Sequence, residues 1–174
     1  MTDLVPLVPV DELPDDLRAQ WEATRRSGLR DFVRMMANAP DHFRRYNEVY
    51  SALRFENHLG PRTTELVRLA VAATTRCQVC MAGRHPTAVA DGLTEEAVSE
   101  IACTEQPHLT PSERVAVAFA TKLATDHLEI TPEDTAELRD HFTPEQIVEL
   151  GLLSVMCLVG RFSMLAGLEE PVIS

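Results

Sequence analysis

Three segments of this chain share one pattern, and that pattern constrains the fold more than any other feature. The three are Thr110-Pro-Ser-Glu113, the close variant Thr131-Pro-Glu-Asp134, and Thr143-Pro-Glu-Gln146. In a capping box the threonine and the third helical residue exchange hydrogen bonds, and proline is favoured at the first helical position. Each of the three is followed by apolar residues at helical spacing. Nowhere does the sequence show the alternation of a strand bounded by turns. The sequence therefore predicts an all-α fold.

Proline and glycine residues at other positions indicate the starts and ends of further helices. Pro14 and Pro40 are placed to begin two helices, and Gly28 and Gly60 are placed to end them. Together with the capped segments, this predicts about eight helices joined by short connections. The last helical stretch carries small residues through an apolar run, which predicts burial at the centre of the domain or in a subunit interface. These residues are Gly151, Ser154, Gly160, Ser163, Ala166 and Gly167.

The length and composition of the chain are those of a single globular domain. The 174 residues are 45% hydrophobic and 25% charged, which predicts a single domain over residues 1–174 with residues 1–13 as an extended N-terminal arm. The formal net charge of −11 disfavours binding to nucleic acid or to an anionic membrane, because both need a basic face.

The expected compartment is the cytoplasm. The N-terminus has no positively charged segment and contains early prolines, so it does not resemble a secretory signal. The longest apolar run, residues 150–160, has about half the length that a bilayer span requires, so no membrane association is expected. Four cysteines without a signal sequence favour a reducing compartment, where a close cysteine pair is typical of catalysis or metal binding.

Reactive side chain types converge at Cys77-Gln-Val-Cys80. Residues 77–83 are predicted to form the first two turns of a helix, whose N-terminal amides stabilise a thiolate. Arg76 and Arg84 add positive charge beside the sulfurs and lower a thiol pKa further. The spacing lets the two sulfurs close a disulfide, which predicts a dithiol redox centre.

The cysteine pair has three other interpretations. A thioredoxin-like site needs a strand–helix–strand context, which is absent. A structural zinc site needs about four ligands, but Cys103 and Cys157 are solitary and are expected in the core, so no metal is predicted. Two inert buried cysteines stay open as an alternative, because cysteine packs like a small hydrophobe.

Glu65 lies one helix upstream, in the apolar stretch that ends near Thr75. If the two helices pack antiparallel across the short turn, its carboxylate faces the sulfurs and can act as general acid or base through water. The alternative is an ordinary surface ion pair with Arg68, three residues further along the helix.

The residues around the cysteine pair resemble a known family. Glu65, Cys77-x-x-Cys80 and Asp91-Gly-Leu-Thr-Glu-Glu96 are similar to the AhpD-like alkylhydroperoxidases of the carboxymuconolactone decarboxylase superfamily. Later runs agree, and the resemblance extends over roughly residues 30–172. These runs are Thr110-Pro-Ser-Glu-Arg-Val-Ala-Val-Ala-Phe-Ala, Phe142-Thr-Pro-Glu-Gln-Ile-Val-Glu-Leu and Gly160-Arg-Phe-Ser-Met-Leu-Ala-Gly-Leu.

The resemblance implies an all-α fold assembled as trimers or hexamers, with peroxidase or disulfide reductase activity that uses no metal or flavin cofactor. It implies that Cys80 attacks a hydroperoxide, that Cys77 resolves the sulfenate, and that Glu65 serves the proton relay. An unknown dithiol or lipoyl group would supply the electrons. Decarboxylases of the superfamily lack the paired cysteines, which steers the prediction away from lactone decarboxylation.

One position departs from the family pattern, which has histidine four residues after the second cysteine. Here that position holds Arg84, and His85 follows it. On a continuous helix Arg84 would stack over Cys80 and stabilise its thiolate, but an arginine does not shuttle protons. Pro86 biases His85 out of helical geometry, which offers His85 as a substitute relay. The substitution also motivates an alternative function, a non-enzymatic redox sensor or a weak metal clasp.

Overall fold

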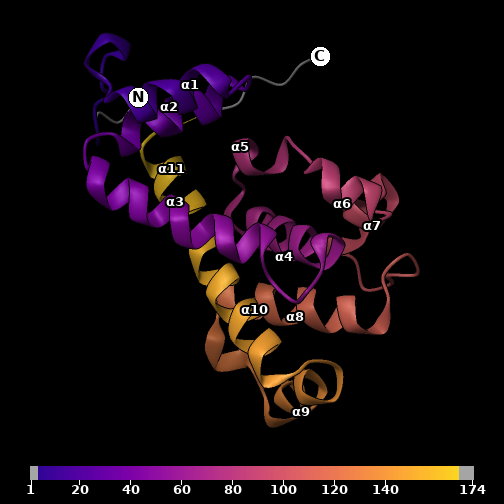
Figure 1. Ribbon diagram of the computed structural model, residues 1–174. Coiled ribbons are helices and arrows are strands. Elements are labelled where there is room, and N and C mark those ends of the chain that lie inside the picture. Colours follow the sequence, from indigo (N-terminus) through magenta and orange to yellow (C-terminus); the bar gives the residue numbers. More distant parts are fainter. Residues whose placement is uncertain (1–3, 169–174) are drawn as a thin grey trace.

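The computed structural model describes residues 4–168 and confirms the all-α prediction, with no strand among those residues (Figure 1). These residues form eleven α-helices, more than the eight or so expected, and α5, α6 and α7 are each only four or five residues long. The helices are α1 (Asp15–Ala23), α2 (Ser27–Met36), α3 (Pro40–Phe55), α4 (Pro61–Thr75), α5 (Gln78–Met81), α6 (Pro86–Ala90), α7 (Glu95–Ser99), α8 (Pro111–Thr125), α9 (Pro132–His141), α10 (Pro144–Cys157) and α11 (Val159–Leu165). Three 3-10 helices accompany them: η1 (Val10–Glu12), η2 (Glu100–Ala102) and η3 (His127–Glu129).

The predicted helix starts are confirmed. Thr110, Thr131 and Thr143 each form a complete capping box, at the starts of α8, α9 and α10. Pro40 begins α3, and Pro14 immediately precedes α1. These signals are local, because a threonine and the backbone three residues on meet whatever surrounds them.

The two predicted glycine stops are wrong. Gly28 lies inside α2 and is buried, while α1 ends earlier, at Ala23. Gly60 precedes α4 as its N-cap with φ of +83°, a left-handed conformation that glycine adopts without the steric cost that Cβ imposes. It therefore serves the start of one helix rather than the end of another.

Helix α4 is the centre of the domain, and every residue from Thr64 to Ala72 is buried. One side of α4 packs against α6, α7 and η2 around Leu66 and Leu69. The other side packs against α8 and α10 around Val67 and Val71. A helix enclosed on all sides carries few polar residues, so the charged Glu65 and Arg68 within it are unusual.

The N-terminal helices form a separate layer. Helices α1 and α2 lie at one end of the molecule, above α3 and beside α11, while α9 lies at the opposite end (Figure 1). Leu17, Val33 and Phe43 join α1, α2 and α3 in a third apolar cluster. Within the predicted arm, residues 10–12 form η1, Leu13 is buried in the same cluster, and residues 1–3 lie outside the described residues.

Helices α10 and α11 have two unlike faces. Of the six small residues predicted to be buried, Ser154, Gly160 and Ser163 are buried, Gly151 and Ala166 are partly exposed, and Gly167 is exposed. On another face Val148, Leu152, Val155 and Phe162 recur at helical spacing and are exposed, and so are Met164 and Leu165. Within residues 4–168, Pro144–Leu165 is the one helical stretch long and apolar enough to cross a membrane. Core helices pass the same test, and α10 packs on α4 and α8.

Candidate functional site

The paired cysteines follow a sharp turn at the end of α4. Arg76 adopts a left-handed conformation with φ of 53°, the one non-glycine residue with positive φ in the described part of the chain. The Cys77 amide then donates to the carbonyl of Ala72 at 3.2 Å, which closes the end of α4. The turn places Cys77 at the N-cap of α5, where its sulfur accepts a hydrogen bond from the amide of Cys80 at 3.2 Å.

Cys77 and Cys80 form a disulfide, with Cα atoms 5.2 Å apart. Their surroundings differ, because Cys77 is fully buried whereas Cys80 is partly exposed. The sulfur that outside molecules can approach is therefore that of Cys80.

The predicted two-turn helix over residues 77–83 is wrong. Helix α5 ends at Met81 after a single turn, and Arg84 lies in the connection to α6. Arg84 therefore does not stack over Cys80 as a helical neighbour. Its guanidinium forms a forked pair with Glu95, with both distances 3.0 Å, and donates to the carbonyl of Met81 at 2.7 Å. The positive charge of Arg84 is thus directed to α7.

Glu65 and Arg68 form a buried pair rather than a surface pair, which corrects the simpler sequence interpretation. Only 2% of the Glu65 side chain and 9% of the Arg68 side chain are exposed. Arg68 donates from Nε to Oε2 at 2.9 Å and from Nη2 to Oε1 at 2.7 Å. Such two-pronged contacts fix both side chains in one orientation.

Arg68 also holds the redox segment. Its Nη1 donates to the carbonyl of Cys80 at 2.5 Å, and Nη2 donates to the carbonyl of Gly83 at 3.0 Å. A helix of four residues leaves most of its carbonyls without intrahelical partners, and Arg68 satisfies that of Cys80 within α5 and that of Gly83 just after it. Sequence reasoning missed this role, although an arginine inside an otherwise apolar helix was a signal for it.

Two further donors complete the shell of Glu65. The backbone amide of His85 donates to Oε1 at 3.0 Å, and Nη2 of Arg54 donates to Oε2 at 2.6 Å. Burial alone would raise the pKa of Glu65, but Arg68, Arg54 and the His85 amide together lower it. Each carboxylate oxygen accepts two hydrogen bonds, so the group is ionised and fully occupied. In this state it positions its neighbours, and a proton relay would need one of the four bonds to open.

His85 caps α6 in an extended conformation, with φ of −74° and ψ of 134°, as Pro86 predicts. Its Nδ1 lies 2.6 Å from Oγ1 of Thr87 and 3.3 Å from the Thr87 amide nitrogen, and its ring centroid is 4.6 Å from that of Phe55. Burial, and then the charge of Arg54, lower the pKa of His85, so the imidazole is neutral near pH 7. The hydrogen bonds of the ring go to Thr87 on its own helix and do not engage a sulfur.

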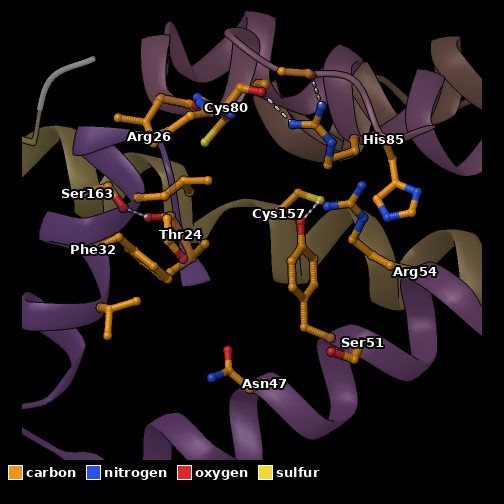
Figure 2. Close-up of a pocket in the computed structure, with 18 of the residues that line it drawn as sticks. Thr24, Arg26, Phe32, Asn47, Ser51, Arg54, Cys80, His85, Cys157 and Ser163 are labelled. Carbon is orange, nitrogen blue, oxygen red and sulfur yellow. Dashed lines mark hydrogen bonds between the residues drawn. The ribbon is translucent and has the colours of Figure 1, made fainter. Parts of the chain in front are cut away.

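A cavity of about 440 Å³ adjoins Cys80 (Figure 2). Helices α1 and α2 and their connection supply one wall, including Thr24 and Phe32, and α3 supplies another, including Asn47 and Ser51. Glu65, Arg68, Arg84 and His85 also line it, so the cavity brings all the predicted site residues together except the buried Cys77.

The two cysteines outside the pair were both expected in the core, and this is right for one of them. Cys157 is buried in the cavity wall, with its sulfur 3.8 Å from the Tyr50 hydroxyl, and burial raises the pKa of its thiol. Cys103 is exposed, because it follows η2 at the surface. Among residues 4–168, no group of three or more His, Cys, Asp or Glu side chains is placed to hold a metal ion.

Gly160 of α11 sits directly against the disulfide. A Cβ atom at this position would lie 3.2 Å from both Cβ of Cys77 and Sγ of Cys80, and 3.3 Å from Oγ1 of Thr75. Only glycine lets α11 approach the cysteine pair this closely, which explains the buried small residue seen in the sequence.

The fold and the site together define a class of all-α protein with a disulfide-forming cysteine pair at the wall of a cavity. Residues 40–122 match the carboxymuconolactone decarboxylase family, and the chain therefore contains a domain of this family with an AhpD-like fold. No curated protein sequence matches the chain.

Solved structures agree with this assignment at the level of the fold. A peroxidase-related protein from Ralstonia eutropha with an alkylhydroperoxidase AhpD core has a TM-score of 0.77 at 21% identity, covering 96% of this chain and 91% of that one. A peroxidase-related protein from Silicibacter sp. has a TM-score of 0.76 at 18% identity, covering 95% and 90%. The debrominase Bmp8 has a TM-score of 0.76 at 16% identity, covering 99% and 94%.

The tight contact at Gly160 leads to a first prediction. Gly160→Ala should lower the free energy of unfolding of the disulfide form by about 1–3 kcal/mol, because the added methyl group overpacks against both cysteines. The matched control is Gly151→Ala on α10, where a Cβ would meet nothing within 4 Å. There the higher helix propensity of alanine should keep or raise stability, by up to about 1 kcal/mol. Urea unfolding of both variants measures the difference, and equal effects would contradict the close packing.

The buried carboxylate leads to a second prediction. Glu65→Gln should lower the free energy of unfolding near neutral pH by about 3–5 kcal/mol, because it leaves a buried guanidinium without its counter-charge. Glu95→Gln, which removes the exposed partner of Arg84, should cost less than about 1 kcal/mol.

The pH dependence of stability has a definite sign. The pKa of Glu65 is lower in the folded than in the unfolded state, so its contribution is complete above the unfolded pKa of about 4.3. That contribution is lost as the pH falls through the folded value. Unfolding curves measured from about pH 6 downward should therefore fall more steeply for wild type than for Glu65→Gln. Parallel curves would show that Glu65 does not titrate with a lowered pKa.

Proposed function

We propose that this protein is a thiol-dependent peroxidase or disulfide reductase that cycles the Cys77–Cys80 pair between dithiol and disulfide. The observation that carries the proposal is the asymmetry of the pair. Cys80 is partly exposed at the wall of a cavity, whereas Cys77 is buried behind it within bonding distance. An attacking thiol needs access to its substrate, and a resolving thiol needs access only to the first sulfur.

The proposed cycle balances without a metal or flavin. The Cys80 thiolate attacks a hydroperoxide, ROOH; its sulfur bonds to the terminal oxygen, the O–O bond breaks, and RO⁻ takes up a proton to leave as ROH. The Cys77 thiol then attacks the sulfenic sulfur, the Cys77–Cys80 bond forms, and water leaves. An external dithiol or lipoyl donor reduces the disulfide by thiol–disulfide exchange and is itself oxidised.

The neighbouring residues have distinct roles in this proposal. Arg68 holds the Cys80 carbonyl and, with Glu65, fixes the loop that carries the sulfurs. His85 is neutral and lines the cavity, so it is the group that can exchange a proton with the leaving alkoxide. Arg84 braces this loop against α7 through Glu95. The reducing cytoplasm is the compartment in which such a dithiol would be recycled.

The cavity favours an organic substrate over hydrogen peroxide alone. Its volume of about 440 Å³ falls in the range that holds small organic ligands. A variant of the debrominase with a similar fold was crystallised in complex with 2,3,4-tribromopyrrole, so this fold can hold a small ring compound.

The third prediction separates the roles of the two sulfurs. With an organic hydroperoxide and a dithiol donor, both Cys77→Ser and Cys80→Ser should lose turnover, while Cys103→Ser, at the exposed cysteine outside the site, should keep it. After one addition of hydroperoxide, dimedone should label the sulfenate in Cys77→Ser, where no resolving thiol removes it, and should not label Cys80→Ser. Mass spectrometry locates the label.

Three outcomes would contradict this proposal. Labelling at Cys77 in the Cys80→Ser variant would reverse the assigned roles. Reversible oxidation of the pair with turnover too slow to consume hydroperoxide would instead favour the redox sensor, and stoichiometric metal in the purified reduced protein would favour the clasp.

We also infer that the protein is a homo-oligomer, a trimer or a hexamer. The support is the apolar stripe on α10 and α11, formed by Val148, Leu152, Val155 and Phe162, each at least 41% exposed. An apolar surface at regular helical spacing is costly in water and is typical of a subunit interface.

The fourth prediction concerns that stripe. Leu152→Glu should reduce the assembled mass measured by light scattering, because a charge at the centre of the stripe would be desolvated on association. Leu128→Glu, at an 80% exposed leucine on η3, is the control and should leave the mass unchanged. A monomeric wild-type protein would exclude the inferred assembly.

A further inference from the structure

The charge of the cavity is opposite to that of the whole protein. The chain carries a formal net charge of −11. Among the described residues that line the cavity, the charged ones are four arginines and one carboxylate: Arg26, Arg54, Arg68, Arg84 and Glu65. A basic recess in an acidic protein attracts anions locally while the remaining surface repels them.

Most of this positive charge is already engaged. Arg68 uses its guanidinium on Glu65 and on the carbonyls of Cys80 and Gly83. Arg84 is neutralised by Glu95. Arg26 donates to the carbonyl of Val79 and has further partners. These three arginines therefore brace the fold around the cavity.

Arg54 differs from the other three. A guanidinium has five N–H donors, and Arg54 directs one hydrogen bond, from Nη2, to Glu65, a carboxylate that Arg68 already neutralises. Its Nε is buried and has no hydrogen-bond partner. Its guanidinium carbon lies 5.7 Å from the centroid of the Tyr50 ring and 5.2 Å from that of the Phe55 ring. Two guanidiniums thus share one carboxylate, and one positive charge is left over at the cavity wall.

A second observation agrees with this excess charge. The pKa of His85, which lines the same cavity, is lowered by burial and by Arg54 and Arg68, and the opposing influence of Glu65 does not compensate. Figure 2 shows Arg54 and His85 on one side of the cavity and Cys80 on another, with Cys157 between them.

We propose that the cavity binds a ring-sized organic acid whose carboxylate pairs with Arg54 and whose apolar body lies among Phe32, Tyr46 and Tyr50. The volume accommodates such a molecule, and the aromatic lining suits a ring. A carboxylate is the partner that a guanidinium prefers, and when paired with the Nη atoms of Arg54 it supplies the missing negative charge. That this acid carries the hydroperoxide reduced at Cys80 rests on the function proposed above; the binding itself does not.

Binding to the disulfide form tests the site without any turnover. Calorimetric titration of the oxidised protein compares 4-isopropylbenzoate with 4-isopropylbenzamide, which has the same shape and no charge. The acid should bind about tenfold more tightly, the ratio expected for one charge-assisted contact. Equal affinities, or no binding of either compound, would overturn the proposal.

Variants assign the preference to Arg54. Arg54→Gln should remove the tenfold preference, and Arg54→Lys should keep part of it, because the charge stays while the fork is lost. Arg45→Gln is the matched control, an exposed arginine on the same helix and outside the cavity. If Arg54→Gln does not fold, Ser51→Phe fills the cavity one turn earlier on α3 and should weaken both ligands. Undiminished acid binding in Arg54→Gln or in Ser51→Phe would overturn the site.

A kinetic comparison separates this proposal from the proposed function. Wild-type enzyme should reduce 4-carboxylated cumene hydroperoxide with higher kcat/KM than cumene hydroperoxide, and Arg54→Gln should equalise the two. Tight acid binding with no peroxide consumption would refute the peroxidase and leave the site standing. Efficient turnover with equal kcat/KM for the two hydroperoxides would refute the acid specificity and leave the peroxidase standing.

Discussion

The site depends on one buried interaction, the pair between Arg68 and Glu65. Two charges inside the central helix are expensive to desolvate, and such a pair is a weak source of stability in itself. It is explained by what else it holds. Arg68 satisfies the carbonyls of Cys80 and Gly83, and Glu65 accepts the amide of His85 and the guanidinium of Arg54. Segments far apart in the sequence therefore meet at one carboxylate.

These hydrogen bonds between distant segments explain which parts of the structure could be predicted from the sequence and which could not. The capping boxes of α8, α9 and α10 were predictable, because their bonding partners lie within three residues. The single turn of α5 was not, because its carbonyls are completed by Arg68, twelve residues away from Cys80. Gly60 failed for a different reason, because a glycine with positive φ can end one helix or precede the next, and here it is the N-cap of α4. Local signals predicted the fold, whereas the site is made by tertiary contacts.

The unequal exposure of the two sulfurs follows from packing. The Cys77 amide donates to α4 and the Cys77 sulfur accepts from α5, so both its backbone and its side chain are fixed in the turn between the two helices. Gly160 brings α11 against the pair without a side chain in between. Cys80 is left facing the cavity, so the unequal exposure of two identical residue types is a consequence of helix geometry.

The cavity has walls both inside and outside the segment that matches the family. The family match covers residues 40–122, which include Glu65, Arg68 and both cysteines of the pair. Thr24 and Phe32 come from α1 and α2 and their connection, and Ser163 comes from α11, so much of the cavity wall lies outside that match. Arg54 lies within the matched segment and lines the same cavity as the residues from outside it. Every hydrogen bond of the Arg68–Glu65 pair is made within that match, so a substitution in the outer wall alters the cavity without removing a partner of the pair.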